Sequence, residues 1–212
     1  MRSYTVRGSL PLLALSVVSM MGWAAAPARA AMIGLHTSFP DVYSNAIAIS
    51  YSYDSGTNRG TLTATGTAKD DKLSGSTTPI TSGAFSLSTQ FTKTGTGNTA
   101  VLTPVSGTLN ITGNSGTTFF YSTSFLAIGY DPAKDDFDFI FGPGTGTDTN
   151  GTDKLGVILH GSTTTTFTTY FFDSTFSNAA HIGTADTFAV PEPASLALLG
   201  LAFPLLFRRR KV

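Results

Sequence analysis

The sequence predicts an all-β fold, a two-layer antiparallel β-sandwich of the jelly-roll type, and three observations favour this class. Several segments alternate apolar and polar residues with a period of two, which is typical of strands with one buried face. Clusters of Gly, Asn, Asp and Ser separate these segments at the spacing of strands and turns. Threonine supplies 33 of the 160 residues from 31 to 190, and its branched Cβ and hydroxyl suit the solvated face of a sheet.

The alternation assigns the residues of each predicted strand to two faces. In the segment AFSLSTQF, for example, Phe85, Leu87, Thr89 and Phe91 share the side that we expect to be buried. No stretch shows a 3.6-residue apolar stripe of helix length, and no fixed repeat period indicates a solenoid. The segments expected as strands are 46–53, 61–68, 84–91, 108–112, 117–130, 136–142, 154–160 and 165–173.

The charge of the predicted body, residues 31–189, excludes one class of partner. It contains six Lys and Arg residues and twelve aspartates, so its formal net charge is about −6, although the net charge of the whole chain is zero. Nucleic-acid binding needs clustered Lys and Arg, and the body has no such cluster. Cysteine is absent from the sequence, which excludes disulfides, a thiolate nucleophile and cysteine metal ligands.

Residues 1–30 have the three parts of a secretory signal peptide. Arg2 and Arg7 give a positive start, an apolar run follows, and Ala28 and Ala30 are the small residues that a signal peptidase reads. An N-terminal membrane anchor is the alternative, but the Ala-Arg-Ala ending favours cleavage after Ala30. We therefore expect the mature chain to begin at Ala31.

The tail, residues 190–212, combines a proline bracket, a short apolar run and a basic end. The run 194–207 has 14 residues, which as a helix would cover about 21 Å, less than the ~30 Å hydrocarbon core of a bilayer. The cations at 208–211 would stay on the cytoplasmic side. An ordinary single-span anchor is the alternative, but such an anchor would have a longer apolar span and would not require a Pro-Glu-Pro segment.

This tail resembles the PEP-CTERM sorting signal. The resemblance rests on Pro191, Glu192 and Pro193, then the short apolar run, then the terminal basic residues Arg208, Arg209 and Arg210. It implies processing by a membrane-embedded exosortase in a Gram-negative, exopolysaccharide-producing bacterium. The chain would rest transiently in the inner membrane and then reach the outer surface or the extracellular space.

The body offers little sign of catalysis. Its histidines, His36, His160 and His181, are far apart in the sequence and are interpreted as isolated turn or surface residues. The segment GNSGT lacks the spacing of a nucleophile elbow, and the aspartates fall mostly in turn-like contexts. A hydrolase would require two carboxylates across one cleft, and nothing nominates such a pair. We expect a protein that is not an enzyme and has no cofactor.

Two acidic segments are the candidates for metal binding. In DTNGTD, the alternate oxygen donors Asp148, Asn150 and Asp153 resemble the first half of a calcium loop, although Asn-Gly is also a strong turn former. In DPAKDDFDF, Asp136 and Asp138 alternate with phenylalanines, which favours a strand with one solvated face over a metal site.

We therefore expect an exported, non-enzymatic structural protein that associates with exopolysaccharide in the matrix. The alternative is a lectin-like carbohydrate-binding module, whose binding calcium could assist. Consecutive aromatic residues at 119–121 and 170–172 must turn at least one ring outward in each strand, and exposed rings can stack on sugars. Core packing of both segments is the competing interpretation.

Overall fold

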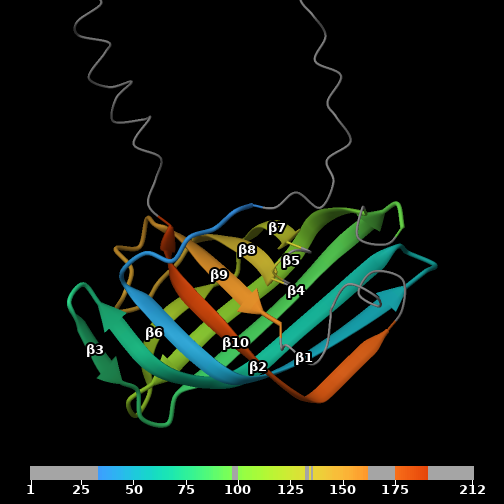
Figure 1. Ribbon diagram of the computed structural model, residues 1–212. Coiled ribbons are helices and arrows are strands. Elements are labelled where there is room, and N and C mark those ends of the chain that lie inside the picture. Colours follow the sequence, from blue (N-terminus) through green and yellow to red (C-terminus); the bar gives the residue numbers. More distant parts are fainter. Residues whose placement is uncertain (1–32, 97–99, 132–133, 135, 162–174, 191–212) are drawn as a thin grey trace, which may run out of the picture.

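The body is a single antiparallel sheet in which almost every strand pairs with its neighbours in the sequence (Figure 1). The computed structural model describes residues 33–96, 100–131, 134, 136–161 and 175–190. Its strands are β1 (Asp41–Asp54), β2 (Arg59–Leu73), β3 (Ser76–Pro79), β4 (Ala84–Thr94), β5 (Val101–Gly113), β6 (Thr117–Ser122), β7 (Phe125–Asp131), β8 (Asp136–Pro143), β9 (Lys154–His160) and β10 (Phe176–Val190).

The order of the strands is β6-β5-β4-β2-β1-β10-β9-β8-β7, with the short β3 paired to β2. This arrangement confirms the prediction of an all-β antiparallel fold. It differs from the Greek-key order of a jelly roll, because the strands follow one another as a meander. The chain passes from one edge of the sheet to the other between β6 and β7, and its first and last strands, β1 and β10, pair in the middle.

The sheet curls so that its two halves face each other across one core, an arrangement consistent with the predicted two layers (Figure 1). At the seam, β5 lies against β7. A side chain at Gly107 would come within 2.8 Å of the Cβ atom of Phe125, so only glycine fits there. The backbone of Tyr121 exchanges two 2.8 Å hydrogen bonds with Thr145, which join the edge strand β6 to the segment that follows β8.

The alternation read from the sequence decides which side of each strand is buried. Phe85, Leu87, Thr89 and Phe91 are all at most 1% exposed, whereas Ser86 between them is exposed. Burial alternates in a similar way in β1 and β2, whereas most residues of β8 and β9 are buried on both sides. Together these strands form one continuous core, rich in phenylalanine. Rings pack in pairs within it, as Tyr51 stacks on Phe91 with ring centroids 6.0 Å apart.

The sequence did not reveal β10, although this strand lies at the centre of the sheet. Half of its apolar residues are alanine and the apolar residues do not recur at every second position, so its alternation is weak. The predicted strand at 165–173 lies outside the described residues. The segment 117–130, expected as one strand, is instead β6 and β7 separated by Thr123 and Ser124.

The residues that precede β1 lie over the outer side of β8, β9 and β10. The backbone N–H groups of Gly34 and Leu35 donate to Oδ2 of Asp138, at 2.9 and 3.2 Å. The hydroxyl of Ser38 donates to the carbonyl of Ala189 at 2.6 Å. Residues 33–38 therefore form a strap that ties the start of the body to β8 and to the end of β10.

The part of the chain that the structure describes contains no helix long and apolar enough to span a membrane.

Adjacent residues of β4 test this account of the core. Truncation of the buried Phe85 to alanine should lower the free energy of unfolding by about 3–5 kcal/mol, because it removes a ring and leaves a cavity. Ser86→Ala, on the exposed side, should change it by no more than about 0.5 kcal/mol. Urea denaturation measures both values, and equal effects of the two substitutions would contradict the assignment of faces.

Candidate functional site

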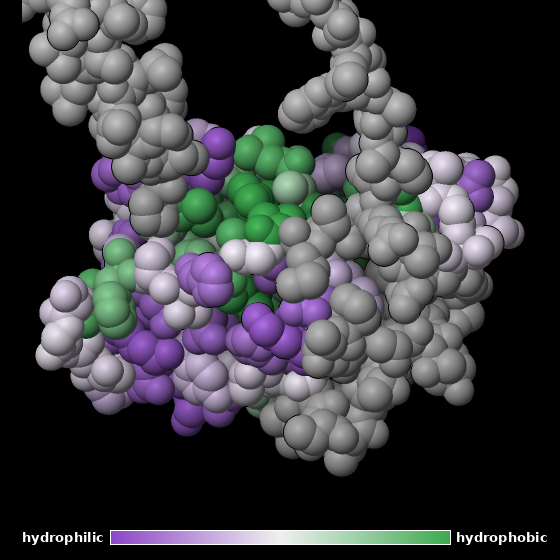
Figure 2. Space-filling model, turned by 45° about the horizontal axis from the view of Figure 1, so that its top comes forward, coloured by the Kyte–Doolittle hydropathy of each residue, from purple (hydrophilic) through white to green (hydrophobic). Residues whose placement is uncertain are grey.

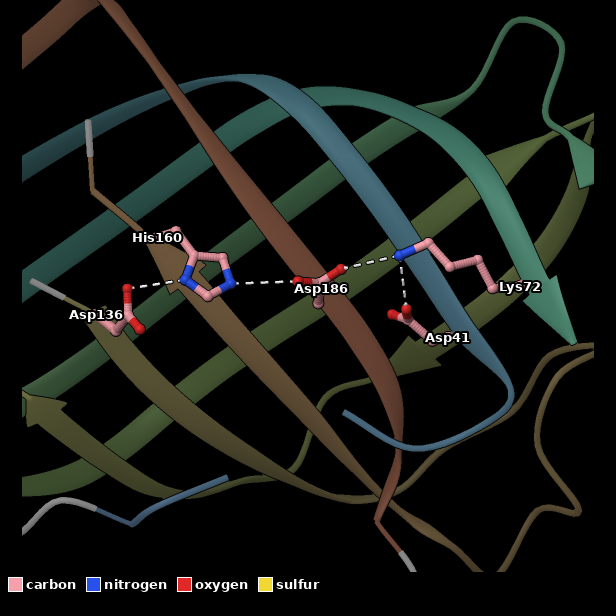
Figure 3. A network of polar contacts seen from close by, with 5 residues as sticks. All are labelled: Asp41, Lys72, Asp136, His160 and Asp186. Atoms are coloured by element: carbon pink, nitrogen blue, oxygen red, sulfur yellow. Dashed lines mark hydrogen bonds and ion pairs between the residues drawn. The ribbon is translucent and has the colours of Figure 1, made fainter. Parts of the chain in front are cut away.

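A chain of alternating charges crosses the outer side of five strands (Figure 3). His160 of β9 lies between two carboxylates, with Nδ1 2.8 Å from Asp136 Oδ1 and Nε2 3.2 Å from Asp186 Oδ2. Lys72 of β2 continues the chain, because its Nζ lies 3.6 Å from Asp186 Oδ1 and 3.1 Å from Asp41 Oδ2. We call these five residues the ionic network.

Strand register brings these residues together from distant parts of the sequence. His160 pairs with Asp136 across β8 and β9, and Asp41 pairs with Lys72 across β1 and β2. Asp186 on β10 stands between these two groups, because β10 is the strand that joins β9 to β1. The network therefore spans the junction at which the two halves of the sheet meet.

The carboxylates favour the charged form of His160. The hydrogen bond to Asp186 is the largest influence and raises the pKa of His160; burial opposes it, and the bond to Asp136 adds to the rise. The pKa of the imidazole consequently lies above its usual value of 6.5. When the ring is protonated, both of its nitrogens donate to carboxylate oxygens.

Burial shapes the other end of the network. It raises the pKa of Asp41 to about 6, the charge of Asp186 adds to this rise, and Lys72 opposes it. Burial alone would lower the pKa of Lys72. Its bond to Asp41 and the charges of Asp41 and Asp186 outweigh this effect, so the pKa lies above the usual value.

A cavity of about 350 Å³ lies between the strap and the ionic network. Polar and charged groups from β7 to β10 line its floor, and Asp138 holds the strap above them. Burial raises the pKa of Asp138, whereas the two hydrogen bonds from N–H groups of the strap favour its charged form and lower the pKa. In Figure 2, hydrophobic residues gather on this side of the molecule, and hydrophilic residues lie beside them. The lining residues are Gly34, Leu35, His36, Thr37, Asp131, Lys134, Asp136, Asp138, Ile158, His160 and Asp186.

The network is suited to fastening strands rather than to proton transfer. A general base needs a nitrogen lone pair directed at the proton it removes, yet both ring nitrogens of His160 face carboxylates. Within the described residues, no group of three or more His, Cys, Asp or Glu side chains is arranged to hold a metal ion.

Two interpretations of the sequence are wrong at this site. His160 is a strand residue bonded on both sides, not an isolated turn or surface histidine. Asp136 and Asp138 are only 9% and 7% exposed, so β8 does not have a solvated acidic face. Several aspartates also lie within strands and not in turns. The network residues are 24 or more positions apart, and no short motif could have indicated their contact.

The candidate calcium residues lie in the loop between β8 and β9. Asn150 closes a turn, because its Oδ1 accepts hydrogen bonds from the N–H groups of Thr152 and Asp153 at 2.8 and 3.0 Å. Its amide nitrogen donates to Asp153 at 3.0 Å, so the structure brings these two residues together through the amide. Oδ1 of Asp148 accepts a hydrogen bond from the hydroxyl of Thr147 at 3.2 Å, and within the described residues no hydrogen bond joins Asp148 to Asn150 or Asp153. Calcium binding by this loop stays a prediction.

Asp148 is influenced instead by a carboxylate of β2. Burial raises the pKa of Asp148 to about 6, and the charge of Asp71 adds to this rise. The hydrogen bond from Thr147 has the opposite effect and lowers the pKa. Burial also raises the pKa of Asp71. The charge of Asp71 on β2 thus disfavours ionisation of Asp148 in this loop.

The aromatic segment 117–122 combines buried and exposed rings. Phe119 and Phe120 are 4% and 0% exposed, whereas Tyr121 is 40% exposed. One ring of this group therefore turns outward, as the sequence indicated. The second group, Tyr170, Phe171 and Phe172, lies outside the described residues.

The folded sheet ends where the predicted sorting signal begins. Ala189 and Val190, the last residues of β10, pair with Leu155 and Lys154 of β9. The Pro-Glu-Pro motif follows directly in the sequence. The proposed sorting residues at 191–193 and 208–210 and the predicted cleavage residues Ala28 and Ala30 lie outside the part that the structure describes.

Comparison with known proteins identifies this tail. The PEP-CTERM protein-sorting motif matches residues 189–211, which confirms the resemblance inferred from the sequence. The motif implies an exported protein, processed by an exosortase in the membrane and directed to the cell surface. No curated protein and no solved structure matches the chain. The sorting motif is therefore the part of the chain with a recognised counterpart.

The raised pKa of His160 predicts pH-dependent stability. A pKa above the unfolded value gives stability that is complete below pH 6.5 and is lost as the pH rises through the folded pKa. His160→Gln should therefore cost about 1–2 kcal/mol near pH 5.5 and less at pH 8.5.

Urea denaturation at both pH values measures this effect. His36→Gln provides the control, because His36 is an exposed histidine of the strap and lies outside the ionic network. A cost for His160→Gln that is equal at the two pH values, or larger at pH 8.5, would show that the ring is not held in its charged form.

Proposed function

We propose that this protein is a non-enzymatic component of the cell surface or extracellular matrix, where it associates with exopolysaccharide. The sorting motif at residues 189–211 is the observation that carries the proposal, because it implies delivery to the surface. The signal peptide predicted at residues 1–30 would start export. The tail would then hold the chain in the inner membrane until the exosortase acts.

The position of the motif supports this route. The strand β10 ends at Val190, and its final residues are paired on β9 up to that point. Processing near Pro191, Glu192 and Pro193 would therefore leave every strand of the body intact. The two prolines cannot continue a strand ladder or a helix, so they separate the folded sheet from the apolar run.

The chemistry of the body supports a non-enzymatic role. Both nitrogens of His160 are occupied by carboxylates, and the sequence has no cysteine. A body made of one curled sheet with a phenylalanine-rich core is suited to persist outside the cell as a scaffold.

A carbohydrate-binding module is the second candidate, and the exposed ring of Tyr121 favours it. Its exposed fraction of 40% leaves an aromatic surface available to a sugar ring. In this case the body would recognise the polysaccharide directly instead of being retained in it through bulk association.

Fractionation of the native host tests the sorting step. The parent protein should be recovered outside the inner membrane with an intact mass that lacks residues 1–30 and the segment after the Pro-Glu-Pro motif. A variant with Pro191, Glu192 and Pro193 all changed to alanine should stay in the inner membrane at its longer mass, because the enzyme has lost its recognition segment.

Thr65→Ala is the control, since Thr65 is exposed on β2 and distant in sequence from the tail. It should fractionate like the parent. Recovery of the parent in the inner membrane with Arg208, Arg209 and Arg210 still present would instead indicate an ordinary anchor and would remove the basis of the proposed function.

A further inference from the structure

One outer side of the sheet carries an ordered set of uncharged polar groups. In the middle of β2, β4 and β5, alternate residues point away from the core, and the side chains at Thr61–Thr67, Ser86–Gln90 and Ser106–Asn110 that do so are hydroxyls or amides. We call this surface the hydroxyl face and define it by Thr61, Thr63, Ser88, Gln90, Ser106 and Thr108.

Register arranges these groups in two parallel rows. Thr61 pairs with Gln90, and Gln90 pairs with Ser106. In the second row, Thr63 pairs with Ser88, and Ser88 pairs with Thr108. Neighbouring groups within a row are separated by the strand spacing of about 4.8 Å, and the rows by about 7 Å, the length of two residues.

The two rows enclose a shallow hollow. Five of the six residues of the hydroxyl face, all except Thr63, line a cavity of about 290 Å³, together with Gly107 and Thr123. Apart from Thr123, the lining residues come from the paired strands β2, β4 and β5, which form the floor of the hollow. The register of β4 and β5 shifts beside it, between Gln90 and Phe91.

Most of these groups are available to a ligand. The hydroxyls of Ser50 and Thr63 bond to each other at 3.0 Å, which extends the second row onto β1. Within the described residues, no other side-chain hydrogen bond joins the hydroxyl face to the rest of the protein. Each remaining hydroxyl can both donate and accept a hydrogen bond.

The charge of this face determines which partner it fits. None of its six residues is charged, although the whole body has a net charge of about −6. The ionic network takes its residues from β1, β2, β8, β9 and β10, and its one residue on β2, Lys72, lies nine positions beyond Thr63 of the hydroxyl face. An uncharged surface with many hydroxyls complements an uncharged chain that also has many hydroxyls.

We propose that the hydroxyl face binds an extended, neutral polysaccharide chain. The inference rests on the proposed association with exopolysaccharide and assigns it a surface and a ligand class. An aromatic ring extends the surface, because Tyr121 of β6 pairs with Asn110 of β5, beside the second row, and is 40% exposed. A sugar ring stacked on Tyr121 would continue the hydrogen-bonded rows.

Affinity electrophoresis of the full chain in detergent, run at a pH well above its pI of about 6.8 so that the chain migrates, tests this proposal. The gels would contain hydroxyethyl cellulose, dextran or laminarin as neutral probes, and alginate as the anionic probe. The neutral probe that retards the parent should do so equally at low and high salt, because the contacts involve no ion pairs. Alginate should cause less retardation.

A pair of variants with equal net charge locates the site. Ser88→Glu with Thr108→Glu places two carboxylates in the second row and should weaken the association constant at least tenfold. Thr77→Glu with Thr78→Glu adds the same charge on the exposed strand β3 and should bind like the parent. Tyr121→Ala, on another strand, should weaken binding without adding any charge.

Three results would overturn the inference. Equal binding by the two glutamate variants would place the ligand elsewhere, even if the protein is correctly sorted to the surface. Stronger retardation by alginate would contradict a neutral ligand, and no retardation by any of the three neutral probes would contradict the ligand class. Fractionation of the host reports on sorting separately, so failure of the two proposals can be distinguished.

Discussion

The pairing of β1 with β10 is the contact on which the rest of the structure depends. These are the first and last strands of the chain, and their ladder joins the two halves of the sheet. The sequence contains no cysteine, so no disulfide can close the fold in its place. Hydrogen bonds along the ladder, the buried side chains beneath it and the ionic network above it must hold the two halves together. A chain that ended before residue 176 would lack the strand that joins β9 to β1.

This closure connects the fold to its route through the cell. Because the sheet is complete only at Val190, the body and the sorting motif meet without a separating linker. The hydroxyl of Ser38 reinforces that junction by donating to the carbonyl of Ala189. The same curl produces two different outer surfaces, one charged and partly covered by the strap, the other uncharged and open. Structural fastening and the proposed ligand binding would therefore occupy separate regions of the outer side of the sheet.

The sequence predicted local structure well and distant contacts poorly, for a physical reason. Alternation is a local property, so the buried side of β4 could be identified from Phe85, Leu87 and Phe91 alone. The sorting motif is equally local. The ionic network depends on register between strands far apart in the sequence, and His160 gave no sign of its two carboxylate partners. The sequence did not indicate β10 because its apolar residues, half of them alanine, do not alternate, although pairing with both β1 and β9 places this strand inside the sheet.

Native-state hydrogen exchange of the full chain, followed by mass spectrometry, tests the closing role of this pairing most directly. If the β1–β10 ladder holds the sheet together, amides in residues 185–188 should exchange as slowly as those of β4, through global unfolding. The free energy of opening should then be the same for both strands. Exchange of residues 185–188 as fast as that of the loop 145–153, with β1 and β4 still protected, would contradict the account. It would show that the last strand opens independently and that the body is stable without closure.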